Sequence, residues 1–84
     1  KLFIPKKNSP EYIGKSYGLA YEFGERWVSE GKMAGYNIGM NIGRCAGQTV
    51  FWPHIHFIPR HEGDADPRGG MRYAHPGADH TEQY

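Results

Sequence analysis

One amphipathic segment, residues 9–31, dominates the fold that this chain can adopt. Ser9-Pro10-Glu11 is a helix-start signal, because the hydroxyl can cap free amides, proline suits the first helical position and the acid suits the positive end of the dipole. Apolar residues then recur at spacings of three and four, and we expect this stripe to face a sheet: Ile13, Tyr17, Ala20, Trp27 and Val28. Charged residues lie mostly outside the stripe, namely Lys15, Glu22, Glu25 and Arg26. Gly31 is expected to end the helix.

Three glycines interrupt this predicted helix: Gly14, Gly18 and Gly24. Each costs about 0.5–1 kcal/mol relative to alanine, so the helix must depend on tertiary packing. Their small size favours close packing against a sheet, with a helix-to-helix contact in a dimer as the alternative.

Three short apolar or alternating runs predict strands, at residues 2–5, 36–41 and 50–58. Residues 42–47 between the last two contain two glycines and predict a turn. A strand, a helix and then a hairpin-like pair of strands favour an α+β fold over a parallel sheet. We expect a single domain of 84 residues, with a core at 1–59 and a loop-rich tail at 60–84.

The composition narrows the class of partner. Ten basic and nine acidic residues give a net charge of +1, which argues against a broad surface for nucleic acid or anionic membrane. The single cysteine, Cys45, excludes an intramolecular disulfide. A chain this short buries only about 60–65% of its unfolded surface, so we expect oligomerisation to add burial. No apolar run approaches the roughly 20 residues of a membrane span, and we expect a cytoplasmic protein.

Two histidines occupy alternate positions in the third predicted strand. One face of that strand would carry Val50, Trp52, His54, His56 and Ile58, and the other Phe51, Ile55 and Phe57. The two imidazoles would lie about 6.6–7 Å apart on a rigid platform. This pattern alone is compatible with a structural pair, a catalytic pair or a metal site.

The surrounding sequence is more specific. GQTVFWPHIHFIPR, residues 47–60, resembles the signature of the histidine triad (HIT) family. GYNIGMNIGRCAG before it, GDADPRGGMR after it and LFIPKK near the start resemble flanking segments of bacterial diadenosine polyphosphate hydrolases. The resemblance implies a HIT-like antiparallel sheet with one main helix.

It also implies a chemistry. His54 matches the middle histidine, which attacks the α-phosphorus to form a nucleotidyl-histidine intermediate, and a backbone carbonyl is expected to hold its other nitrogen. His56 matches the third histidine, which binds phosphate oxygens and favours departure of the leaving group. Glutamine is common there in nucleotidyl transferases, so His56 favours hydrolysis over transfer. The resemblance as a whole implies hydrolysis of phosphoanhydride or phosphoramidate bonds in a purine nucleotide, with no obligatory metal or other cofactor.

Further residues match the family's phosphate-binding positions. Asn41 and Gln48 would contact phosphate through their side-chain amides, Gly47 would let backbone approach the anion, and Thr49 belongs to the same segment. We expect His54 to face a hollow bounded by residues 41, 48 and 56. Ordinary turn chemistry is the alternative for these polar residues.

The sequence departs from the family in three places. Trp52 stands where the first triad histidine belongs, and its indole is expected to fill space or to stack on a base. Asn8 replaces a common histidine, and we expect the preceding family region that contacts base and ribose to be missing. We therefore expect an N-terminally shortened domain, or a homodimer whose second chain completes the pocket.

Three alternatives to a hydrolase remain at this stage: a nucleotidyl transferase, a non-catalytic nucleotide-binding module, and a metal site formed by His54, His56 and His75. We expect His61, His75 and His80 to be solvated and Cys45 to be inert.

Overall fold

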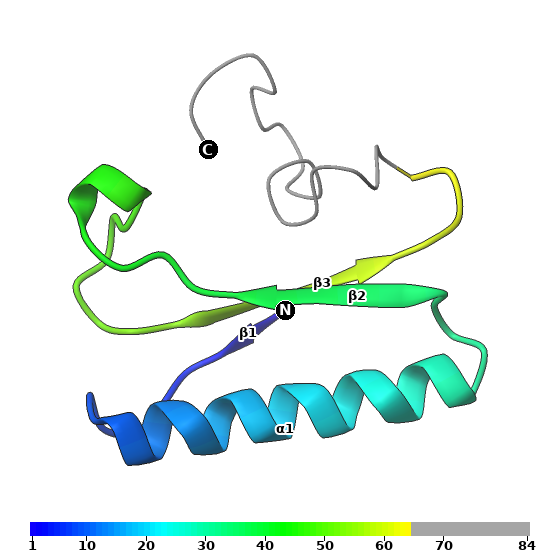
Figure 1. Ribbon diagram of the computed structural model, residues 1–84, viewed down its shortest axis with the longest axis horizontal. Helices are drawn as coiled ribbons and strands as arrows, with labels where there is room; N and C mark the ends of the chain where they lie inside the picture. The colour runs from blue at the N-terminus through cyan, green and yellow to red at the C-terminus, as the bar shows by residue number, and fades with distance from the viewer. Residues whose placement is uncertain (65–84) are drawn as a thin grey trace.

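The computed structural model describes residues 1–64, which form one long helix packed on one face of a three-stranded sheet (Figure 1). The elements follow in the order β1 (Leu2–Phe3), α1 (Pro10–Ser29), β2 (Gly35–Gly39), the short 3-10 helix η1 (Arg44–Ala46) and β3 (Ile55–Arg60). The strand order is β1-β3-β2, and both pairs are antiparallel. The predicted α+β class with one main helix is confirmed. Within residues 1–64, no helix has both the length and the apolarity needed to cross a membrane.

Helix α1 begins and ends where the sequence predicts. The Ser9 hydroxyl accepts a hydrogen bond from the Tyr12 amide at 3.4 Å, and Pro10 is the first helical residue. Ser29 is the last helical residue, and Gly31 follows with a positive φ of 75°. The hydroxyl cap thus satisfies one of the free amides at the start of α1.

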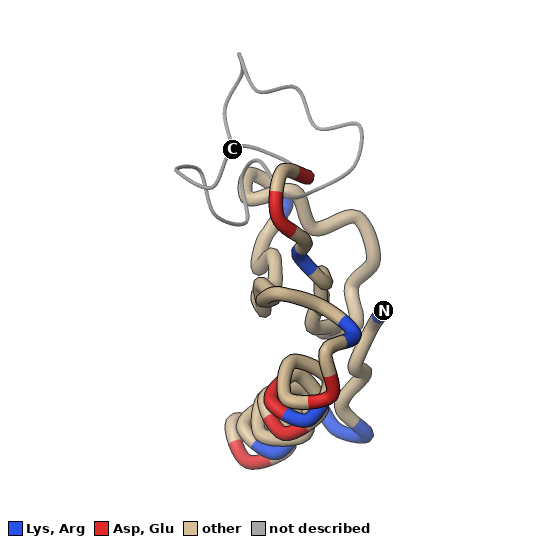
Figure 2. Tube along the Cα trace, turned by 90° about the vertical axis from the view of Figure 1, so that its right-hand side faces the viewer, with Lys and Arg blue, Asp and Glu red and all other residues tan. Residues whose placement is uncertain are grey.

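The apolar stripe of α1 faces the sheet, and its charges face outward. Every predicted stripe residue is buried or half-buried, and Ser16, Phe23 and Gly24 join them. The four charged residues predicted outside the stripe are exposed, and Figure 2 shows acidic and basic residues along the length of the helix. This division agrees with the amphipathic pattern of the sequence.

The core between α1 and the sheet is built around Phe57. This residue is 2% exposed and lies with the buried Ala20 and Met33. Its ring contacts Phe23 edge to face at 5.1 Å and stacks on Tyr36 at 5.2 Å. Aromatic contacts therefore join the helix to the two strands β2 and β3.

The helical glycines divide into two kinds. A Cβ at Gly24 would lie 2.5 Å from Cζ of Tyr36, so only glycine lets this ring lie against the helix. At Gly14 and Gly18 an added Cβ would meet nothing within 4 Å. Close packing against the sheet is thus confirmed for Gly24 alone.

The second and third predicted strands are displaced. β2 covers residues 35–39 instead of 36–41, which leaves Asn41 in the following loop. β3 covers residues 55–60 instead of 50–58, so the prediction of a strand over 50–54 is wrong. Pro53 has no amide to donate to a neighbouring strand, which explains why regular pairing starts only after it.

Candidate functional site

His54 and His56 lie side by side although only His56 belongs to the strand. His54 immediately precedes β3, and the two ring centroids are 4.9 Å apart with an angle of 64° between the planes. Their neighbours Ile55 and Phe57 are buried, whereas both histidines are half-buried. The alternation of β3 therefore directs the two imidazoles away from the side on which Phe57 meets α1.

One nitrogen of His54 is held by the backbone. Its Nδ1 atom lies 3.0 Å from the carbonyl oxygen of Trp52. A carbonyl oxygen can only accept, so this contact is a hydrogen bond when Nδ1 carries the proton. In the neutral ring the lone pair then lies on Nε2, and Nε2 is the nitrogen that can attack an electrophile.

Trp52 forms hydrogen-bond contacts through both its side chain and its backbone. The indole Nε1 donates to the Pro5 carbonyl at 2.9 Å, across 47 residues of sequence, while the Trp52 carbonyl faces His54. The side chain is still 44% exposed. Trp52 thus links the segment that follows β1 to the histidine pair.

An apolar hollow of about 160 Å³ adjoins His54. It is lined by Leu2, Ile4, Val50, Trp52 and His54. Leu2, Ile4 and Val50 are each at least half exposed, so the hollow is open to solvent and suited to a flat apolar group beside the imidazole.

The loop between β2 and β3 is closed by Gln48. Its Oε1 accepts from the Gly43 amide at 2.8 Å, and its Nε2 donates to the Val50 carbonyl at 2.9 Å. Both ends of the amide are therefore engaged within the loop. This is the turn chemistry that the sequence left open as the alternative to phosphate contact.

Asn41 and Gly47 lie close together within this loop. Gly47 has φ +94° in the left-handed region, where glycine is strongly favoured. A Cβ there would lie 3.4 Å from Nδ2 of Asn41, so the two residues are neighbours. Asn41, Gly47 and Thr49 are all exposed.

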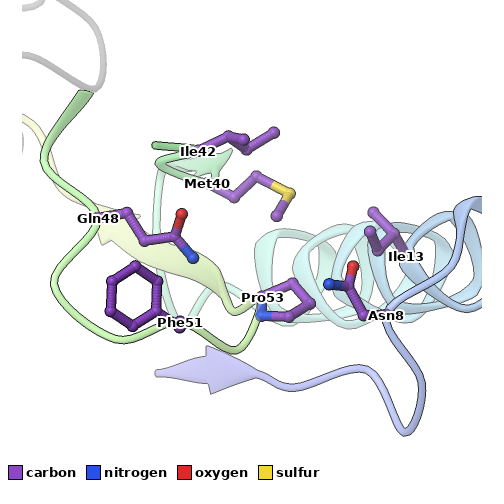
Figure 3. A pocket seen from close by; sticks show the side chains of 7 residues that line it. All are labelled: Asn8, Ile13, Met40, Ile42, Gln48, Phe51 and Pro53. Carbon is purple, nitrogen blue, oxygen red and sulfur yellow. The ribbon is translucent and has the colours of Figure 1, made fainter. Parts of the chain in front are cut away.

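Gln48 faces a second hollow, of about 180 Å³, which neither His54 nor His56 lines (Figure 3). Its walls come from the start of α1, the loop after β2 and the segment before β3, namely Asn8, Ile13, Met40, Ile42, Gln48, Phe51 and Pro53. His54 and Gln48 therefore line two different hollows. The expected hollow shared by residues 41, 48, 54 and 56 is not among them.

The remaining predicted residues are placed as follows. Cys45 and His61 are exposed, whereas His75 and His80 lie outside the described residues. No group of three or more histidine, cysteine, aspartate or glutamate side chains in residues 1–64 could hold a metal ion. The proposed third ligand of a metal site, His75, lies outside that range.

The comparison with known proteins decides the family. The HIT domain profile matches residues 5–63, well over half of the chain. The chain belongs to the HIT family. An uncharacterized HIT-like protein of Methanocaldococcus jannaschii is 59% identical over 32 residues, which cover 38% of this HIT chain and 25% of the relative. The match thus spans a quarter of that protein's length. No solved structure matches the chain at a significant level.

Two features of this HIT site were missed from the sequence. Pro5 serves as an acceptor for Trp52, and Leu2 and Ile4 line the hollow beside His54. The apolar run of residues 2–5 gave no sign of either role. The signal that could have found them is the antiparallel pairing of β1 with β3, which brings the start of the chain beside the histidine segment.

Proposed function

We propose that this HIT protein hydrolyses a phosphoanhydride or phosphoramidate bond of a purine nucleotide, such as a dinucleoside polyphosphate, through a nucleotidyl-His54 intermediate. The observation that carries the proposal is the contact of 3.0 Å between Nδ1 of His54 and the Trp52 carbonyl. In the neutral ring, this contact favours the tautomer with the proton on Nδ1 and the lone pair on Nε2. Membership of the HIT family supports the same chemistry.

The reaction has two displacement steps. Nε2 of His54 attacks the α-phosphorus, a P–N bond forms, and the bond from phosphorus to the leaving group breaks. Water then attacks the same phosphorus, the P–N bond breaks, and the proton of the water passes to solvent. An imidazole suits both steps because an ordinary histidine, with a pKa of about 6.5, is largely neutral at pH 7.

His56 would assist from beside the nucleophile. Its ring is 4.9 Å from that of His54 between centroids, which places it within reach of oxygens on a phosphorus bonded to Nε2. A hydrogen bond from this imidazole would offset charge that develops on phosphate oxygens or on the leaving group. Asn41, Gly47, Gln48, Thr49 and Trp52 remain the proposed substrate-binding residues.

The role of Gln48 requires a local change. Its amide already bonds to Gly43 and Val50, so a phosphate contact would replace at least one of these bonds. The apolar hollow beside His54 offers a different region of contact, for a purine base or for the nucleoside of the leaving group.

The test is to trap the intermediate. The full chain is mixed with a dinucleoside polyphosphate labelled at the α-phosphorus and quenched in alkali, in which a phosphoramidate survives, and the labelled peptide is identified. We expect the label on His54. His54→Ala should abolish it and lower turnover by on the order of 10³-fold or more.

His61→Ala is the matched control, because it removes an exposed histidine of the same chain. This variant should be labelled like the parent. Equal labelling of His54→Ala and the parent would dismiss His54 as the nucleophile.

A non-catalytic nucleotide-binding module is the second candidate. It is favoured by Trp52 at the first triad position and by the engagement of Gln48 within its own loop. In that case calorimetry would detect binding of AMP, while the same preparation would give neither label on His54 nor product.

A further inference from the structure

The pairing of β1 with β3 stops at a pair of prolines. Leu2 pairs with His56 and Phe3 with Ile55, so the same register would place Pro5 opposite Pro53. Neither proline has a backbone amide to donate, so the hydrogen-bonded ladder cannot continue through this pair. Both prolines are buried. Beyond Phe3 and Ile55, the segment after β1 and the segment before β3 therefore have no regular strand pairing.

The Trp52 indole supplies a donor at this point. Its Nε1 donates to the Pro5 carbonyl at 2.9 Å, next to the place where the ladder lacks one. The bond is partly buried, and Trp52 also lines the hollow beside Leu2 and Ile4. A side-chain bond thus takes the place of a backbone bond between β1 and the segment that leads into β3.

The same residue presents its carbonyl to His54. The acceptor of the Nδ1 contact belongs to Trp52 itself, so the position of this carbonyl depends on how the Trp52 backbone is held. We infer that Trp52 is a positioning residue, an inference that rests on the proposed function. The indole bond to Pro5 holds the Trp52 carbonyl in place. That carbonyl in turn keeps the proton of neutral His54 on Nδ1 and leaves Nε2 free to attack.

This inference gives Trp52 a role different from both expectations for its side chain. The indole neither merely fills space nor needs to stack on a base, because it bonds to the neighbouring strand end. The residue at the first triad position then acts through the geometry of His54. It need not touch the reacting phosphorus.

The first measurement requires no variant. Proton exchange of the two indole N–H groups is followed by NMR in the full chain, with Trp27 as the internal comparison. We expect the Trp52 indole proton to exchange at least about 10-fold more slowly than in an unfolded peptide, as a bonded and partly buried donor should. Exchange at the unfolded-peptide rate would overturn the inference.

The second measurement compares Trp52→Phe with Trp27→Phe. Both variants replace an indole by a phenyl ring, but only the first removes the donor to Pro5. Two-bond proton–nitrogen NMR of the histidine side chains reports the tautomer of neutral His54. We expect Nδ1–H in the parent and in Trp27→Phe, and a mixture of tautomers in Trp52→Phe. The same tautomer in all three proteins would overturn the inference.

The third measurement is the single-turnover rate at which label appears on His54. We expect Trp52→Phe to slow this step by about 10- to 100-fold at saturating substrate, as misplacement of a nucleophile by about 1 Å does. Unchanged formation of the intermediate in Trp52→Phe would count against the inference. If the parent itself gives no label, the proposed function fails, but the tautomer comparison still decides whether Trp52 positions His54.

Discussion

At the scale of single residues, Gly24 shows how closely the helix approaches the sheet. The ring of Tyr36 lies over this glycine, and three of its atoms are 2.5–2.7 Å from the position that a Cβ would take. The same ring stacks on Phe57 at 5.2 Å between centroids, which limits how far it can shift. Two aromatic side chains and one glycine thus set the local distance between α1 and β2.

We therefore predict opposite effects for two glycine substitutions in α1. Gly24→Ala should lower the free energy of unfolding by about 1–3 kcal/mol, because the added methyl overpacks against Tyr36. Gly18→Ala should raise it by about 0.5–1 kcal/mol, because the helix gains propensity and the methyl meets nothing within 4 Å. Urea unfolding of the two variants beside the parent measures both. Stabilisation by Gly24→Ala would contradict the packing described for Tyr36.

At the scale of elements, Tyr36 also joins α1 to β2 through its hydroxyl. The hydroxyl donates to a carboxylate oxygen of Glu25 at 2.8 Å. Burial, followed by the hydrogen bond and the charge of Glu25, raises the pKa of Tyr36 from 10.0 to about 12. Each of these causes favours the neutral phenol over the phenolate in the folded protein.

This shift predicts a loss of stability at alkaline pH. Between pH 10 and about 12 the unfolded chain releases the Tyr36 proton while the folded chain retains it, so the free energy of unfolding falls as pH rises. The contribution is fully present below pH 10 and is lost through about pH 12. Urea unfolding across this range should show a smaller decline for Tyr36→Phe than for the parent.

The matched control is Tyr17→Phe, which removes the hydroxyl of another half-buried tyrosine, on α1. Comparison with this variant separates the effect of the Tyr36–Glu25 contact from that of losing a tyrosine hydroxyl. Identical pH profiles for the parent and Tyr36→Phe would show that Tyr36 titrates alike in the folded and unfolded chains.

The segment between β2 and β3 is held by side chains more than by strand pairing. Gln48 closes the loop through Gly43 and Val50, and Trp52 reaches Pro5. This arrangement leaves the two histidines on a braced backbone at the start of a strand. A nucleophile in an exposed site needs supporting hydrogen bonds of this kind to keep its orientation.

At the scale of the whole molecule, the described fold has one covered sheet face and a small core. Ile55 and Phe57 are the largest fully buried side chains of residues 1–64. Several large apolar side chains near the site are exposed: Leu2, Ile4, Ile42, Val50, Phe51 and Trp52. A second chain that covered some of this surface would add the burial that a small domain lacks.

We accordingly predict that the protein forms a homodimer. Size-exclusion chromatography with light scattering should report twice the mass of the chain. The midpoint of thermal unfolding should rise with protein concentration, because dissociation then accompanies unfolding. A monomer at every concentration tested, with an unfolding midpoint independent of concentration, would contradict this prediction.

What the sequence determined by itself is local. The cap at Ser9, the end near Gly31 and the amphipathic stripe of α1 depend on residues within a few positions of one another, and each is found where it was predicted. The order of strand, helix and paired strands followed from the same short-range patterns, and the histidine motif indicated the HIT family.

Only the tertiary structure decided what surrounds the histidines. The bond of Trp52 to Pro5 joins residues 47 positions apart, and the start of β3 depends on which residues β1 brings opposite it. Gln48 could have faced solvent or phosphate, and its contacts with Gly43 and Val50 follow from how the loop closes. Strand register and packing bring these partners together. Neither the register nor the packing can be deduced from the sequence pattern of a single segment.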